Sequence, residues 1–172
     1  MKWILIVVAV IVLIAGAVTL AGLMLPRDHV ASTTTVINAP AQDVWDALVN
    51  VSEYPRWRPD VRSVDVLSTE GALRWRERTR QGDLTLERME EDRPRRLVTR
   101  IADETLPFGG TWTYELAPDS QRTRLTITER GYVTNPLFRF MSRFVFGHHQ
   151  TQEDFLRALG RRFGQDVAIT RA

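Results

Sequence analysis

Five polar side chains are expected to point to the same side of the fold as a set of core aromatic rings: Glu77, Arg88, Tyr114, Glu129 and His148. Carboxylate, phenol and imidazole groups can move protons in enzymes, and they can also orient the polar head of a bound molecule. Buried charges must in any case be paired, so ion pairs inside the core are the simplest interpretation. No two of these residues have a spacing that forces a catalytic geometry, so we favour pairing or ligand contact over catalysis.

His148 lies on the apolar stripe of an expected helix. A single histidine in such a place is more often a hydrogen-bonded wall residue than a general base. If the polar groups line a cavity, Trp75, Trp112 and Phe155 would surround the apolar part of the ligand. The residues that we predict to contact a ligand are Trp57, Trp75, Glu77, Arg88, Trp112, Tyr114, Glu129, Phe144, His148 and Phe155.

Composition excludes several common catalytic and cofactor sites. The chain has no cysteine, which excludes disulfides, thiolate nucleophiles and cysteine-ligated zinc. Its only lysine is Lys2, so the folded part has neither a Walker A lysine nor a Schiff-base lysine. Adjacent residues such as His148 and His149 would point about 100° apart on a helix, so they do not form a metal-binding pair. With these sites excluded, we expect neither a metal nor a cofactor.

The charge pattern argues against a nucleic-acid partner. The 23 basic residues are interleaved with 21 acidic residues, and the formal net charge is only +2. Such a chain lacks the basic stripe that binds a phosphate backbone. Arg74, Arg76, Arg78 and Arg80 are expected on the solvent side of a sheet. Besides ligand binding and catalysis, a third interpretation is that these arginines bind an acidic protein. The sequence does not identify a protein partner.

Residues 3–25 form an uncharged apolar run. As a helix this run would span roughly 34 Å, which is enough to cross a hydrocarbon core of about 30 Å. A signal peptide cleaved near residues 15–17 is the alternative, but it would leave the apolar residues 18–25 exposed. We therefore favour an uncleaved single-pass anchor, with Lys2 in the cytoplasm and the folded domain outside it. Residues 26–28 reach at most about 10 Å, so the domain should lie against the lipid headgroups.

Strands with alternating apolar and polar residues predict an antiparallel sheet with one buried face. A first hairpin with its turn at Gln81 and Gly82 would pair Arg80 with Asp83, Arg76 with Glu87 and Trp75 with Arg88. It would also make Glu77 and Arg88 near-diagonal neighbours. A second hairpin with its turn at Ser120 and Gln121 would pair Leu116 with Leu125, Tyr114 with Ile127, Trp112 with Glu129 and Thr113 with Thr128.

A helical period replaces the strand pattern from Pro136 to about Gln165. We predict one helix, roughly 45 Å long, whose apolar stripe packs against the unmatched face of the sheet. The start of this helix is apolar nearly all round, with Phe138 and Phe144 beside Arg139 and Arg143. These side chains are either covered by neighbouring loops or dip into the interface of the membrane.

Residues 37–57 carry the most informative motif, INAPAQDVWDALVNVSEYPRW. A strand end is followed by an Asn-Ala-Pro break, a helix with one apolar stripe, and a compact Tyr-Pro-Arg-Trp turn. This opening resembles that of the START/polyketide-cyclase (SRPBCC) superfamily, and most closely its polyketide cyclase/dehydrase and lipid-transport group. The resemblance implies an α+β helix-grip fold, in which a curved antiparallel sheet of six to seven strands wraps around a long C-terminal helix. It also implies a cavity for an apolar ligand between the two.

We therefore divide the chain into a transmembrane anchor (1–25), a linker (26–29), a START/polyketide-cyclase-like domain (30–166) and a tail (167–172). The leading hypothesis is a non-enzymatic, membrane-tethered domain that binds a lipid or another apolar small molecule. The alternative is a cyclase or dehydratase for a ring-forming substrate, with Glu129, Tyr114 or His148 as proton shuttles.

Overall fold

The computed structural model describes residues 2–146 and 149–171, with the side chains of 145 and 146 left out. The first half contains α1 (Lys2–Met24), β1 (Asp28–Ile37), α2 (Ala41–Val49), a short 3₁₀ turn (Val51–Glu53), α3 (Tyr54–Trp57), β2 (Val61–Ser68), β3 (Arg74–Thr79) and β4 (Asp83–Asp92). The second half contains β5 (Arg96–Ile101), β6 (Phe108–Asp119), β7 (Arg122–Val133), α4 (Pro136–Met141), the π-helical turn η2 (Ser142–Phe146), α5 (Gln150–Arg162) and β8 (Thr170–Arg171).

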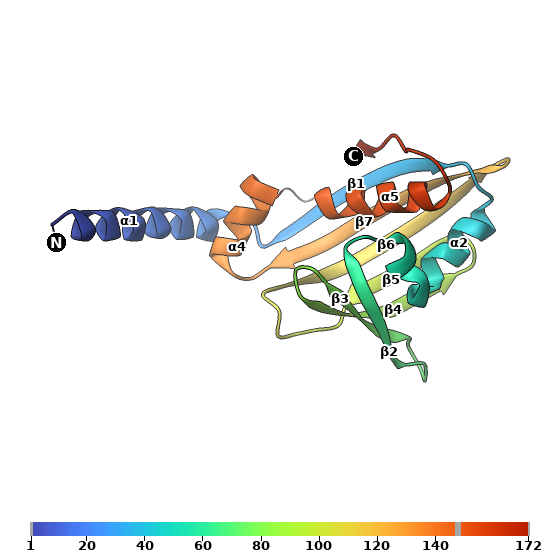
Figure 1. Cartoon of the computed structure of the whole chain (residues 1–172), viewed down its shortest axis with the longest axis horizontal. Coiled ribbons are helices and arrows are strands. Elements are labelled where there is room, and N and C mark those ends of the chain that lie inside the picture. The colour runs from blue at the N-terminus through green and yellow to red at the C-terminus, as the bar shows by residue number, and fades with distance from the viewer. Residues whose placement is uncertain (1, 147–148, 172) are drawn as a thin grey trace.

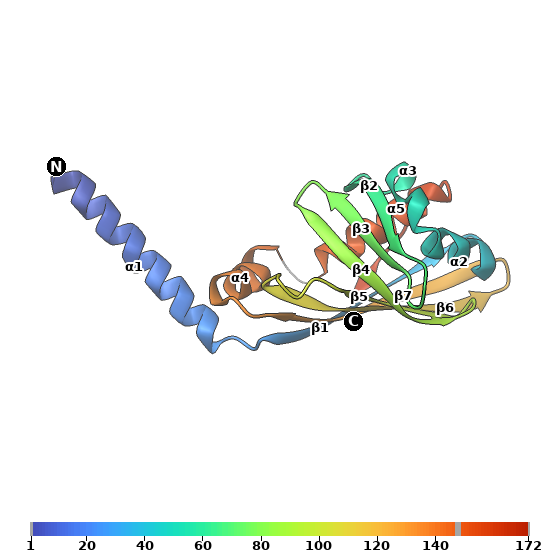
Figure 2. The same cartoon turned by 90° about the horizontal axis from the view of Figure 1, so that it is seen from below.

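Helix α1 projects from one end of the folded domain (Figures 1 and 2). Apart from Lys2 it contains only uncharged residues, and nearly all of its side chains are exposed. It is long and apolar enough to cross a membrane. Exposed leucine, isoleucine and valine in such number are unfavourable in water, so an apolar environment would stabilise this helix.

The eight strands form one antiparallel sheet in the order β2-β3-β4-β5-β6-β7-β1-β8. Figure 2 shows β2 to β4 rising away from β6, β7 and β1, so the sheet curls around α5. The register of β6 with β7 confirms the predicted second hairpin, including its turn at Ser120 and Gln121 and its pairs of Leu116 with Leu125, Tyr114 with Ile127, Trp112 with Glu129 and Thr113 with Thr128. The two-residue strand β8 pairs with β1 and adds one strand to the six or seven predicted.

The predicted register of the first hairpin was wrong by two residues. Its strands pair Arg74 with Glu87, Trp75 with Leu86 and Arg78 with Asp83. The turn residues are Arg80 and Gln81, because the Thr79 hydroxyl donates to the Gly82 carbonyl and accepts from the Gln81 amide. Gly82 has φ +138°, a conformation that favours glycine. A shift of two residues keeps every side chain on its predicted face, so Trp75 and Glu77 are still buried.

The prediction of one helix from Pro136 to Gln165 was also wrong. Helix α4 ends at Met141, η2 follows it, and α5 begins only at Gln150. The Asn135 side chain starts α4 by accepting from the amides of Leu137 and Phe138. Helix α4 packs against α1, whereas α5 packs on the sheet. The two parts of the apolar stripe therefore pack against different elements of the fold.

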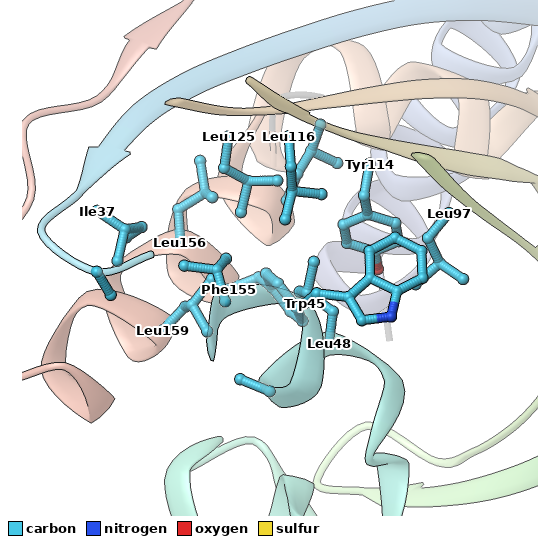
Figure 3. Close-up of a cluster of buried hydrophobic side chains, with 14 residues drawn as sticks. Ile37, Trp45, Leu48, Leu97, Tyr114, Leu116, Leu125, Phe155, Leu156 and Leu159 are labelled. Carbon is cyan, nitrogen blue, oxygen red and sulfur yellow. The ribbon is translucent and has the colours of Figure 1, made fainter. Parts of the chain in front are cut away.

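The core lies between α2, the concave face of the sheet and α5 (Figure 3). Helix α2 contributes Trp45 and Leu48, and α5 contributes Phe155, Leu156 and Leu159, all of them buried. The sheet contributes Ile37, Leu97, Tyr114, Leu116, Leu125 and Ile127. A curved antiparallel sheet that closes on a C-terminal helix is the helix-grip architecture, which confirms the predicted fold class.

Candidate functional site

Aromatic side chains fill much of the space between the sheet and α5. The ring of Phe155 lies 5.4 Å from Trp57, 5.9 Å from Trp112 and 5.7 Å from Tyr114, between ring centroids. Tyr54 stands edge-on to Trp57 at 5.3 Å. Edge-to-face and tilted contacts at these distances are favourable, so α5 is fixed on the sheet by a connected aromatic cluster.

Two open hollows over the described residues lie elsewhere. One, of about 530 Å³, opens on the outer face of the sheet near Arg74, Arg76 and Thr85. The other, of about 550 Å³, lies beside Glu153, Arg157 and Arg171 at the C-terminal end. We expected an open cavity behind α5, but over the described residues the end near α2 and α3 is packed by its own rings. A ligand there must displace rings or lie toward α1, where α5 no longer covers the sheet (Figure 1).

A buried ion pair borders the aromatic cluster. Arg58 lies 3.0 Å from the Glu77 carboxylate, and the Trp75 indole donates to the same carboxylate at 3.0 Å. The guanidinium also lies over the rings of Tyr54 and Phe155, 5.0 and 5.3 Å from their centroids. Burial alone would lower the pKa of Arg58, but the negative charges of Glu77 and Asp60 raise it. The guanidinium of Arg58 therefore stays charged inside the fold.

Two buried tyrosines, Tyr54 and Tyr114, lie near this ion pair. The Tyr54 hydroxyl donates to the Leu48 carbonyl at 2.7 Å. Burial, and secondarily the charge of Glu77, raises the pKa of Tyr54. Burial also raises the pKa of Tyr114, whose hydroxyl has a hydrogen bond with Thr99. Both phenols are therefore neutral at ordinary pH and act as hydrogen-bonding groups rather than bases.

A second polar group lies on the part of the concave face nearer α1. Glu129 lies 3.2 Å from His29 Nε2 through one oxygen, and accepts from the Trp112 indole at 2.9 Å through the other. Both side chains are partly buried, 16% exposed for His29 and 22% for Glu129. Gly131 leaves room for the imidazole, since a Cβ there would lie 2.5 Å from the ring. This carboxylate and imidazole can hold a polar ligand group or exchange a proton.

His29 and Arg58 were not among the predicted site residues. His29 shares its strand face with Ala31, Thr33 and Thr35, so the alternation of β1 was a signal that could have placed it inside. Arg58 follows the aromatic turn, and its approach to Glu77 depends on how α3 packs against β2 and β3. No spacing in the sequence indicates that contact.

Arg88 does not pair with Glu77 as predicted. It donates to the Val49 carbonyl at 3.0 Å and to Glu91 at 2.6 Å. The Arg88 Nε and the Trp57 Nε1 are buried N–H groups that have no hydrogen-bond partner among the described residues. A buried donor without a protein partner normally binds water or a ligand oxygen, so these two predicted site residues offer free donors.

The other predicted site residues divide into three groups. Trp75, Glu77, Trp112, Tyr114, Glu129 and Phe155 point into the concave face and are buried or half-buried. Phe144 lies in η2, is 63% exposed, and contacts Phe140 rather than the aromatic cluster. His148 lies outside the described residues. The structure thus brings most of the set together, while Phe144 belongs to another surface.

Comparisons with known proteins agree on one fold. The family model described as "Polyketide cyclase / dehydrase and lipid transport" matches residues 28–164. Among solved structures, a START superfamily protein from Mycobacterium smegmatis is 16% identical, with a TM-score of 0.63 over 80% of this chain and 98% of its own. A conserved protein from Geobacillus kaustophilus is 14% identical, with a TM-score of 0.67 over 82% and 99%.

A third structure, the Zhui aromatase/cyclase from a Streptomyces species, is 16% identical, with a TM-score of 0.64 over 80% of this chain and 94% of its own. Among curated proteins, no relative matches the chain. At these identities the solved structures establish the fold alone, and the match over residues 28–164 establishes the family.

Proposed function

Because the chain belongs to the polyketide cyclase/dehydrase and lipid-transport family, we propose that it is a membrane-tethered domain that binds a lipid or another apolar small molecule on its concave face. The part of this face toward α1 is only half covered. Trp112, Ile101 and Leu86 are half-buried on neighbouring strands at the border of this part, where Trp112 also contacts Phe155 and Leu86 packs beside Tyr54 and Trp75. Half-buried apolar groups in a concave surface are the usual wall of a site for an apolar ligand.

The proposal rests on this half-covered wall, and the Trp57 N–H at its packed end supports it, because that buried donor has no hydrogen-bond partner among the described residues. Leaving a buried donor unpaired costs about 1–3 kcal/mol, which a ligand oxygen would recover. Arg88 Nε is a second buried donor that has no partner in the described part of the chain, although the other nitrogens of this guanidinium bind Val49 and Glu91. The ligand class that fits has an apolar body and at least one hydrogen-bond acceptor, such as the carbonyl or carboxylate of an acyl lipid.

The position of α1 supports a lipid source for the ligand. Only Leu25, Pro26 and Arg27 separate α1 from β1. Three residues span at most about 10 Å, so a bilayer crossed by α1 would begin next to the sheet. A lipid exchanged over this distance need not cross water. The predicted side of the membrane, with the domain outside the cytoplasm, belongs to the same proposal.

Binding of a fluorescent acyl probe by the detergent-purified full chain tests the proposal. Trp57→Phe keeps the aromatic ring and removes the N–H, and we expect the Kd to rise about 5- to 10-fold, as the loss of one hydrogen bond predicts. Trp3→Phe, on the exposed surface of α1, is the matched control and should leave the Kd unchanged. Wild-type protein that neither binds the probe nor retains extractable lipid would overturn the proposal.

An enzyme is the second candidate, and the contact between His29 and Glu129 favours it. A carboxylate within 3.2 Å of an imidazole on a ligand-facing wall is the arrangement expected of an acid–base pair. The substrate would be a polyketide-like chain that closes into a ring. Wild-type protein that yields no cyclised product from a poly-β-ketone substrate, while still binding the acyl probe, would exclude this candidate and leave the first in place.

A further inference from the structure

Arg139 joins the membrane helix to the folded domain. Its side chain is buried and donates to the carbonyls of Gly22 and Leu25 at the end of α1, at 3.1 and 3.0 Å. It also donates to the carbonyls of Val133, the last residue of β7, and of Thr134, at 3.1 and 2.9 Å. One guanidinium thus connects the last turn of α1 with the end of the sheet.

The residue after Leu25 explains why α1 needs this arginine. The carbonyl of Gly22 would normally accept from the amide four residues later, but that residue is Pro26, which has no N–H. The Leu25 amide reaches this carbonyl only at 3.4 Å, and Arg139 adds a second donor at 3.1 Å. A cation at the C-terminal end of a helix is also favoured by the helix dipole.

Helices α1 and α4 also touch directly through their backbones. A Cβ atom added to Gly22 would lie 2.0 Å from the Pro136 carbonyl oxygen, so only glycine permits this approach. Together with the Arg139 bonds, this contact fixes α4 beside the end of α1. The anchor is therefore continuous with the domain and not a loose tether.

Exposed apolar side chains surround this junction. Leu137 and Phe138 of α4 are 48% and 51% exposed, and Phe144 of η2 is 63% exposed. Phe108 and Tyr132 are also exposed at the neighbouring ends of β6 and β7. The Val133 amide donates to the Arg27 carbonyl, which places this end of the sheet next to the exit of α1. We call these five residues the collar.

We propose that the collar is a membrane-contact surface that lies in the headgroup and acyl boundary of the bilayer crossed by α1. The proposal depends on the membrane anchor of the proposed function. Its support is continuity, because α4 is fixed to the last turn of α1 and must lie where that helix leaves the bilayer. Aromatic and leucine side chains at that depth exchange water for acyl chains, and the exposed Arg143 can contact lipid phosphates.

The absence of cysteine from the sequence makes the test direct, because each introduced cysteine is unique. Leu137→Cys and Phe138→Cys are spin-labelled in full-length protein in phosphatidylcholine and phosphatidylglycerol vesicles, and label exposure to oxygen and to a nickel complex is measured. Leu67→Cys on β2 is the matched control, since Leu67 is 47% exposed. We expect a severalfold higher ratio of oxygen to nickel exposure at 137 and 138 than at 67.

Equal ratios at all three positions would overturn the collar proposal. Spin–spin coupling between labels that disappears on dilution with unlabelled chain would also overturn it, in favour of contact between two copies. Val12→Cys in α1 reports the anchor separately, and a label there that is exposed to nickel would remove the anchor and the collar together. The acyl-probe assay uses no bilayer, so its result distinguishes failure of ligand binding from failure of membrane contact.

Discussion

Arg58 and Glu77 show what the sequence could and could not predict about single residues. The alternation of β3 correctly placed Glu77 inside, and a buried carboxylate required a partner. The partner predicted from the hairpin was Arg88, but Arg58 fills that place from the end of α3. The position of the turn determines which residues pair within a hairpin. A contact between a turn and a distant strand depends on tertiary packing, which no local sequence pattern indicates.

The Arg58 ion pair should be essential for stability. The Arg58 side chain is 12% exposed and that of Glu77 is 3% exposed. Arg58→Met would leave the Glu77 carboxylate buried without its cation, at a cost of about 3–5 kcal/mol in the free energy of unfolding. Urea unfolding of the full chain in detergent, followed by tryptophan fluorescence, measures this loss.

Arg56→Met is the control, two residues away on the same turn. Arg56 pairs with Glu53, but its side chain is 77% exposed, so water replaces the lost contact and stability should hardly change. Equal destabilisation by the two substitutions would show that burial of the ion pair has no special effect.

Among the elements, the strands were predictable and the division of the C-terminal helix was not. The alternation of apolar and polar residues predicted which side chains of β3, β6 and β7 face inward. The turn at Ser120 and Gln121 predicted the register of the second hairpin. The first register failed because Thr79 and Gly82 close a turn one residue earlier than expected. The apolar stripe after Pro136 looked continuous, but a stripe does not reveal whether it packs on a sheet or on another helix.

Gly22 tests the contact between α1 and α4. Gly22→Ala would place a methyl group against the Pro136 carbonyl, and overpacking of this kind typically costs about 1–3 kcal/mol. We expect the helices to separate and the amides of α4 to exchange hydrogen faster, as measured by mass spectrometry. Gly16→Ala on the same helix meets no atom within 4 Å and should leave exchange unchanged. Identical exchange in both variants would contradict a tight junction.

For the whole molecule, the important relation is between helix α1, the proposed anchor, and the concave face. The sequence indicated an anchor and a short connection to the first strand, and the structure adds the junction made by Arg139 and Gly22. That junction could not be predicted, because it joins residues more than 100 positions apart. It holds the half-covered part of the sheet at the end of the domain nearest α1 (Figure 1).

The most direct measurement is photo-crosslinking of the full chain in vesicles that contain a diazirine-bearing acyl lipid, with the adducts located by peptide mass spectrometry. Lipid adducts on α1 and α4 would report only that these helices contact the membrane. Binding on the concave face predicts additional adducts on inward residues of β4 to β6, such as Leu86, Ile101 and Trp112, and a loss of these adducts when unlabelled lipid competes. Adducts confined to α1 and α4, with none on the concave face, would contradict the proposed function.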